Sequence, residues 1–158
     1  MIAGVDWGFY PDPAAIILHG EDGQGRIWVF FEYYHLRKTP DEICIVAKKL
    51  NKDHSVETFW CGQDEPGSIE MFRKAGLNAK ANKVMSVAEG QGAVTDLIKN
   101  DALLVSKSCP NWLDEVETFY YPEGKAKPEG PDHALSASRY AIVNMRKIKE
   151  KSKVYIVG

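Results

Sequence analysis

The order of the β-type segments limits the fold of this chain more than any other feature of its sequence. Three apolar segments rich in β-forming residues come first, with no helical pattern between them: Ala3–Asp6, Ala14–His19 and Arg26–Tyr34. The second and third flank Glu21-Asp-Gly-Gln-Gly25, a turn of the Asp-Gly hairpin type. The spacing therefore predicts an antiparallel meander of three strands.

Strands and helices alternate in the rest of the chain. Thr39-Pro-Asp-Glu42 has the residues of a helix start with a capping box, and apolar residues recur at helical spacing after it. Further along we expect strands at 57–61 and 103–105, a short segment at 77–80, and helices at 66–75, 86–100, 111–119 and 132–149. These elements predict a single α/β domain with a mixed sheet, a three-strand meander plus parallel strands, and helices on both faces.

Size and composition are those of one globular domain. The chain has 158 residues, of which 44% are hydrophobic, and this rules out wholesale disorder. No apolar run is long enough to span a bilayer, and residues 1–20 lack the pattern of a secretory signal, so we expect a cytosolic protein without a membrane. Cys44, Cys61 and Cys109 have no zinc-type spacing, and their odd number argues against a disulfide framework. We expect them to be buried thiols.

Charge limits how the chain could bind nucleic acid. The net charge of −2 provides no overall attraction to a phosphate backbone, so any such binding must be local. Lys80 and Lys83, near a predicted turn, are candidates for phosphate contacts, with solvated lysines as the equally good alternative. The four tryptophans lie in apolar runs and are expected in the core rather than on a base-stacking surface.

Acidic residues stand at the ends of several predicted elements. Asp6 ends the first apolar run directly before a glycine-containing turn, Asp64 and Glu65 follow the strand at 57–61, and Asp132 opens the last helix. Each acid alone has an ordinary explanation as a turn former or a helix N-cap. Together they predict a cluster assembled by folding, and an all-oxygen cluster favours hard divalent cations such as Mg²⁺ and Mn²⁺.

Three motifs resemble those of the C-terminal nuclease domain of phage terminase large subunits. They are Gly4-Val-Asp-Trp-Gly8 with Asp12-Pro13, Glu65-Pro-Gly-Ser-Ile-Glu70, and Asp132-His-Ala-Leu135 followed by Arg139-Tyr-Ala141. They cover nearly the whole chain in order. The resemblance implies a ribonuclease H-like, divalent-metal-dependent endonuclease that cuts concatemeric double-stranded viral DNA during packaging in the host cytoplasm. The sheet layout leads to the same fold as one candidate.

The same resemblance implies partners outside this chain. They are an ATPase domain in the full-length protein, the portal and the small terminase subunit, with double-stranded DNA as substrate. The Walker motifs of a packaging ATPase are absent from this sequence. We therefore expect residues 1–158 to be a single nuclease domain excised from a longer terminase large subunit.

Two positions depart from the family pattern. The family usually has its second catalytic acid where this chain has Gly62, and often has a further Asp at the position of Ser136. Asp64 lies two residues after Gly62 and shares its side of a continuing strand, so we assign the missing role to Asp64. Glu65 is the substitute if the strand ends early at Pro66.

These residues together form a hypothesis for a two-ion site. Asp6 would bridge the ions, Asp64 or Glu65 would bind one ion and Asp132 the other. Asp12 would be an auxiliary ligand or simply a turn former before Pro13. His133 is either a metal ligand or water-orienting residue or a surface side chain. Arg139 is expected in an ion pair on the helix surface.

Other functions remain open at this level. A Holliday-junction resolvase or transposase-like nuclease would have the same cluster chemistry, and the terminase-like order of the motifs favours packaging over these. A catalytically weak DNA-docking module of the packaging motor is the alternative from another class. Gly62, at a usual acid position, is the feature that supports it.

Overall fold

The computed structural model describes residues 1–83, 86–123 and 129–152, with side chains of the last helix described as far as residue 145. In this part of the chain one six-stranded sheet has the order β5-β4-β1-β2-β3-β6. Its strands are β1 (Ile2–Asp6), β2 (Ala14–Glu21), β3 (Ile27–His35), β4 (Thr58–Cys61), β5 (Ala79–Ala81) and β6 (Leu103–Val105). Five of them were expected from the sequence within a few residues, and β5 falls on the short segment expected at 77–80.

Strand pairing confirms the predicted mixed sheet. β1, β2 and β3 pair antiparallel, with an irregularity in register between Leu18 and His19 of β2. β4 is parallel to β1, β5 is parallel to β4, and β6 is parallel to β3. The meander therefore forms the centre of the sheet, and the later strands extend both of its edges.

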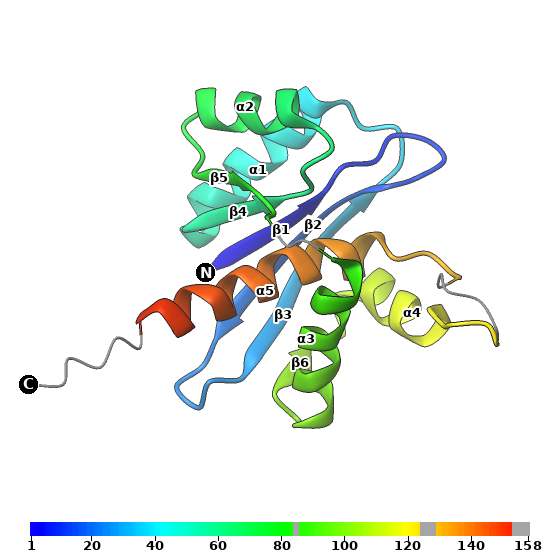
Figure 1. Cartoon of the computed structure of the whole chain (residues 1–158). Coiled ribbons are helices and arrows are strands. Elements are labelled where there is room, and N and C mark those ends of the chain that lie inside the picture. The colour runs from blue at the N-terminus through cyan, green and yellow to red at the C-terminus, as the bar shows by residue number, and fades with distance from the viewer. Residues whose placement is uncertain (84–85, 124–128, 153–158) are drawn as a thin grey trace, which may run out of the picture.

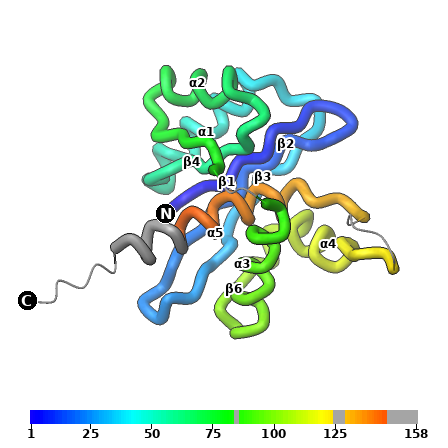
Figure 2. The backbone as a smooth tube through the Cα atoms, viewed as in Figure 1, coloured from blue at the N-terminus to red at the C-terminus, as the bar shows by residue number. Residues whose placement is uncertain are grey.

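Helices cover both faces of the sheet (Figure 1). They are α1 (Pro40–His54), α2 (Pro66–Lys74), α3 (Val87–Lys99), α4 (Pro110–Thr118) and α5 (His133–Ser152). The capping box predicted at Thr39 is present, with Thr39 and Glu42 each accepting a hydrogen bond from the other's backbone N–H. Figure 2 shows α5 crossing the middle of the sheet with α3 beside it, and α5 contacts β1, β2 and β4.

The core has two layers, because both faces of the central strands are buried. Ile16 and Leu18 of β2 face α1 and α2 in the larger layer, while Ala15 and Ile17 face α4 and α5 in the other. A strand alternates its side chains, so neighbouring residues of β2 enter different layers. The continuous apolar run that identified this strand is the pattern of a strand covered on both sides.

The cysteines are buried as expected from the sequence, whereas one of the tryptophans is not. All three cysteines are buried free thiols, as predicted. Trp60 and Trp112 lie in the core, but Trp28 is 41% exposed, so its predicted core position is wrong. Trp28 lies near the hairpin turn, where its indole N–H donates to the Asp22 carboxylate and its ring lies near the guanidinium of Arg26. The β-type pattern alone did not reveal that this position faces solvent.

Helix α5 approaches the sheet most closely at Gly4. A Cβ on Gly4 would lie 1.7 Å from the carbonyl oxygen of Ala137, so no larger residue fits without moving the helix. Ala137 and Ala134 are themselves fully buried, and these small residues bring α5 down onto β1. Because Asp6 is two residues after Gly4 on the same strand, it faces the same helix.

Burial of His19 should make the fold sensitive to acid. Its ring is completely buried and bonds to the Ser138 hydroxyl at 3.0 Å, and burial lowers its pKa to about 3 from 6.5. Below pH 6.5 His19 binds a proton in the unfolded chain but stays neutral in the folded protein. Stability should therefore fall by about 1.4 kcal/mol per pH unit as the pH drops from 6.5 toward 3. Urea midpoints of wild type and His19→Gln between pH 7.5 and 4.5 check this, since parallel profiles would contradict it.

Candidate active site

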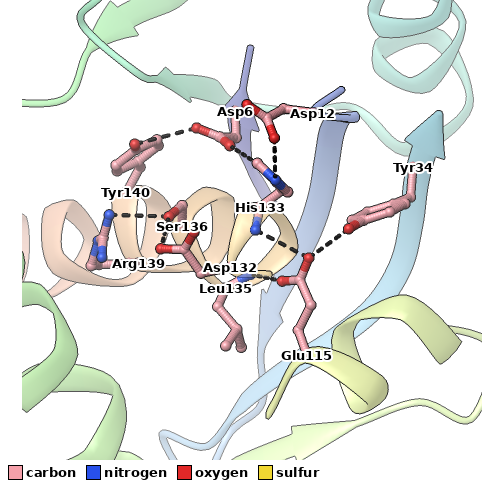
Figure 3. A network of polar contacts seen from close by, with 10 residues as sticks. All are labelled: Asp6, Asp12, Tyr34, Glu115, Asp132, His133, Leu135, Ser136, Arg139 and Tyr140. Carbon is pink, nitrogen blue, oxygen red and sulfur yellow. Dashed lines mark hydrogen bonds and ion pairs between the residues drawn. The ribbon is translucent and has the colours of Figure 1, made fainter. Parts of the chain in front are cut away.

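Asp6, at the end of β1, lies at the centre of a polar network (Figure 3). Its Oδ2 is 3.2 Å from Nδ1 of His133, and its Oδ1 accepts a hydrogen bond of 3.3 Å from the Tyr140 hydroxyl. Its side chain is only 17% exposed. Burial raises the pKa of Asp6, and the negative charge of Asp132 adds to this, while His133 acts in the opposite direction.

His133 lies between two carboxylates. Nδ1 faces Asp6, and Nε2 lies 3.4 Å from Oδ1 of Asp12. The hydrogen bond with Asp6 is the main reason that the pKa of His133 is raised. His133 is therefore part of the network rather than an isolated surface side chain. Asp12 itself is largely exposed in the turn between β1 and β2.

Asp132 reaches the site from the far end of the chain, immediately before α5. Its Oδ2 accepts a hydrogen bond of 3.1 Å from the Ser136 hydroxyl, and its carbonyl oxygen accepts one from the Ser136 N–H. Its charge is close enough to Asp6 to raise the pKa of that carboxyl. The fold therefore brings Asp6 and Asp132 to one place, although they are 126 positions apart in the sequence.

Asp64 and Glu65 are exposed in the turn between β4 and α2, and they face different surroundings. Asp64 lines a polar cavity with Tyr140 and Arg139, on the α5 side of the sheet. Glu65 lines a separate cavity with Trp7 and with residues of α1 and α2. Of the two alternatives for the second acid, only Asp64 borders a residue that contacts Asp6.

Tyr140 fills the space beside Gly62. The Gly62 N–H donates to the carbonyl of Val5, so Gly62 lies next to the end of β1. A Cβ on Gly62 would lie 3.3 Å from the Tyr140 ring and 3.6 Å from the Trp7 ring. An aromatic side chain from α5 thus occupies the position toward which an acid at 62 would point.

The predicted acids do not form a closed metal cage in this conformation. Among the residues that the structure describes, no three His, Cys, Asp or Glu side chains are grouped closely enough to hold an ion. The oxygen atoms of Asp6 are instead engaged by His133 and Tyr140. The donor set nevertheless consists of carboxylates with one imidazole, which fits a hard divalent cation such as Mg²⁺ or Mn²⁺.

The two candidate DNA-binding lysines lie on β5 and just after it, next to the strand that leads to Asp64. Lys80 is exposed on β5, with its ammonium 5.5 Å from the centre of the Trp60 ring. Lys83 is also exposed and follows Asn82, which lines the cavity. Both lysines are therefore near the edge of the sheet where Asp64 lies.

Among the described residues, Arg139 does not form the ion pair that was expected on the helix surface. Its Nη2 donates to the Ser136 hydroxyl at 3.1 Å, and its guanidinium lies 5.4 Å from the centre of the Tyr140 ring. Within the described ranges it forms no ion pair, so the predicted helix-surface pair is wrong. Figure 3 shows the Arg139 guanidinium below the Tyr140 ring and bonded to Ser136, which in turn bonds to Asp132.

Sequence reasoning assigned no site role to Tyr140, Ser136 or Glu115. Helical spacing offered a signal for two of them, because Ser136 is four residues after Asp132 and Tyr140 is seven after His133, on the same faces of the helix. Tyr140 stays protonated, since burial raises its pKa to about 12. No local pattern distinguished Glu115 from the exposed acids of α4.

Glu115 holds the start of α5 in place, and its loss should destabilise the domain. This buried carboxylate accepts hydrogen bonds from the Tyr34 hydroxyl and from the backbone N–H groups of His133 and Leu135. Burial raises its pKa. Glu115→Ala should destabilise the domain by about 2–4 kcal/mol, because buried donors lose their partner. Urea unfolding measures this, with Glu117→Ala on the exposed side of α4 as the near-neutral control. Equal effects of both changes would contradict the capping role.

No helix in the described part of the chain combines the length and the apolar character needed to cross a membrane.

Comparisons with known proteins identify the family. The model of the terminase RNaseH-like domain matches residues 3–145. A search of curated proteins finds no match. The large terminase of the thermophilic bacteriophage D6E is 21% identical to this chain, with a TM-score of 0.82 over 92% of it. The chain spans only 39% of the length of that protein.

This chain covers a larger share of the solved structures of isolated nuclease domains. The nuclease domain of the bacteriophage SPP1 large terminase (g2p), solved with bound Mn, is 23% identical, with a TM-score of 0.74 over 91% of this chain and 85% of that chain. The large terminase nuclease of the thermophilic phage G20c, solved with bound cobalt, is 15% identical, with a TM-score of 0.65 over 90% of this chain and 79% of that chain. These similarities confirm the ribonuclease H-like fold that the sequence predicted, and this chain belongs to the terminase RNaseH-like domain family.

Proposed function

We propose that this chain is the divalent-metal-dependent endonuclease domain of a terminase large subunit. It would cut concatemeric double-stranded viral DNA when genome packaging begins and ends. The observation that supports this most is the meeting of Asp6 and Asp132 at the end of β1 and the start of α5, in a chain of the terminase RNaseH-like family. The Mn and the cobalt bound to two similar nuclease domains are consistent with a divalent ion here.

The residues that would hold the ions are carboxylates. Asp6 would be the shared ligand, Asp64 would hold one ion from the adjoining cavity and Asp132 the other, and Asp12 would assist from the turn after β1. Two divalent ions would neutralise charge on the scissile phosphate and lower the pKa of an attacking water. Either Mg²⁺ or Mn²⁺ suits these oxygen donors.

Tyr140 and His133 orient the Asp6 carboxylate and offset part of its charge. The Tyr140 hydroxyl donates to Oδ1 of Asp6, and because its pKa is about 12 it keeps that proton throughout the neutral range. It therefore orients the Asp6 carboxylate. His133 holds a proton more readily than an isolated histidine, since it lies between the Asp6 and Asp12 carboxylates. It offsets part of their negative charge.

The chain would work as part of a longer protein. It spans 39% of the D6E large terminase, which has also been solved in complexes with ATP-gamma-S and ADP. We propose that residues 1–158 are the nuclease portion of such a protein. An ATPase domain would lie on the same polypeptide, and the portal and the small terminase subunit would be partners in the host cytoplasm.

A weakly catalytic DNA-docking module is the second candidate. Two observations favour it: glycine occupies position 62, and the described acids do not enclose an ion. A resolvase or transposase-like nuclease has no such observation in its favour, because the family match points to terminases.

A plasmid-nicking assay separates the two candidates. The isolated chain should convert supercoiled DNA slowly into nicked and linear forms with Mn²⁺ or Mg²⁺, with little sequence preference. Activity should be absent in EDTA. Full activity in EDTA would contradict the metal-dependent mechanism, and inactivity with every divalent ion would favour the docking module.

A further inference from the structure

A polar cavity of about 200 Å³ adjoins the Asp6 network. It lies between the turn after β4, Asn82 just after β5, the start of α3 and the side of α5. Its polar lining residues include Gln63, Asp64, Asn82, Ser86, Arg139 and Tyr140. Tyr140 is one wall of this cavity and also donates a hydrogen bond to Asp6, so the cavity adjoins the proposed cleavage site.

Among the described residues that line this cavity, Arg139 is the one with a positive charge, and several contacts hold its side chain. Its guanidinium is held by the Ser136 hydroxyl and lies over the Tyr140 ring. Its alkyl stem passes close to Gly90 of α3, where a Cβ would lie 2.3 Å from Cγ and Cδ. These contacts restrict the side chain before any ligand arrives, which lowers the entropy lost on binding.

The charge of Arg139 is left available by these contacts. Ser136 is neutral and itself donates to Asp132, and in the described part of the chain no carboxylate pairs with the guanidinium. Arg139 also lines a second cavity that includes Asp132. The guanidinium therefore lies between the surroundings of Asp132 and those of Asp6.

The substrate class requires such a cation. DNA phosphates are repelled by the aspartates of this site, and each phosphate that enters needs compensating charge. Arginine suits this role because its planar group offers paired N–H donors to phosphate oxygens. Exposed Lys80 and Lys83 near the same edge would contact phosphates further along the strand.

We propose that Arg139 and the polar cavity beside Tyr140 form the subsite for the DNA phosphate next to the scissile one. This subsite rests on the proposed nuclease function. Arg139 touches the phosphate directly and draws the strand past Asp64 toward Asp6. The cavity would hold the backbone of the strand and read no base, so cleavage is expected to show little sequence preference.

The test separates binding from cleavage. Affinity for a short duplex is measured against salt concentration in the Asp6→Asn background, with Ca²⁺ present, and Mn²⁺-dependent nicking is measured in the otherwise native protein. Arg139→Gln should reduce affinity about tenfold at low salt and lower the slope of log affinity against log salt by about 1. Nicking should fall at least about tenfold. Arg139→Lys should keep the slope and recover nicking only in part.

Lys49→Gln is the control, because it removes an exposed positive charge from α1 on the opposite face of the sheet. It should change neither the salt slope nor nicking. An unchanged slope in Arg139→Gln with a normal melting temperature would overturn the subsite while leaving the nuclease intact. If the native protein does not cut with any ion, the proposed function fails, and the salt slope of Arg139→Gln still decides the subsite.

A second measurement covers the case in which Arg139→Gln does not fold. Phenylglyoxal modification of the native protein, mapped by mass spectrometry, should be reduced at Arg139 by duplex DNA. Arg26, at the hairpin turn, should be modified equally with and without DNA. Equal modification of Arg139 in both conditions would overturn the proposal.

Discussion

Asp6→Asn is expected to abolish Mn²⁺-dependent DNA cleavage while the domain stays folded. The change removes one negative charge from the residue that would be shared by two cations and hardly alters side-chain volume. We expect nicking to fall at least a hundredfold, corresponding to about 3 kcal/mol of transition-state stabilisation. The nicking assay measures the loss of cleavage, and thermal unfolding in EDTA measures whether the domain stays folded.

The direction of the stability change follows from the pKa of Asp6. Burial raises that pKa above 3.8, so the stability contributed by the protonated carboxyl is lost as the pH rises through the raised value. At neutral pH the ionised carboxylate is therefore less favourable in the folded protein than in the unfolded chain, and an amide relieves this cost. The contact with His133 is weakened in exchange. The melting temperature without metal should stay close to that of the wild type or increase.

Asp53→Asn is the matched control for Asp6→Asn. It makes the same chemical change at an exposed position on α1 and should leave cleavage unaltered. Loss of folding in Asp6→Asn would show that the residue is a structural turn former. Normal cleavage in a folded Asp6→Asn protein would remove it from the proposed metal site.

Asp64→Ala should abolish cleavage, whereas Glu65→Ala should only weaken it. Asp64 lines the cavity that Tyr140 and Arg139 share, on the side of the sheet that Asp6 faces. Glu65 lines a cavity with Trp7 on the opposite side. The predicted difference between two adjacent acids is therefore a consequence of the face on which each lies. Initial rates of nicking in Mn²⁺ measure both variants, which serve as controls for each other.

Three outcomes would change this picture. Full activity in both alanine variants would remove the second ligand, and a greater loss in Glu65→Ala would reverse the assignment. Gly62→Asp adds a third measurement, because its carboxylate would enter the space next to the Tyr140 ring. A large gain of activity in that variant would mean that the natural site is degenerate. We expect little gain, since Tyr140 already occupies this space.

Much of the fold followed from local patterns. The apolar run of β2 and the Asp-Gly turn after it predicted the hairpin, and Thr39 with Glu42 marked the start of α1. These features are readable because each depends on residues close together in the sequence. A meander followed by alternating strands and helices then predicted the mixed sheet.

The candidate site was predicted only in part. Acids at the ends of elements indicated Asp6 and Asp132, because strand and helix ends meet at the edges of sheets. The sequence left Asp64 and Glu65 open, and it left His133 between a functional and a surface role. These choices depend on which way a turn directs each side chain, and the residues of the turn do not contain that information.

Local patterns in the chain were enough to predict most of the elements, their order and the family motifs. The folded arrangement was needed to see that Tyr140 and His133 contact Asp6, that Glu115 caps α5 from α4, and that no carboxylate within the described ranges pairs with Arg139. Secondary structure follows from periodicity and capping over a few residues. Polar contacts such as Asp6 with His133 join residues 127 positions apart and depend on how closely α5 packs on β1. That approach is set by Gly4 against Ala137, a contact that no local pattern encodes.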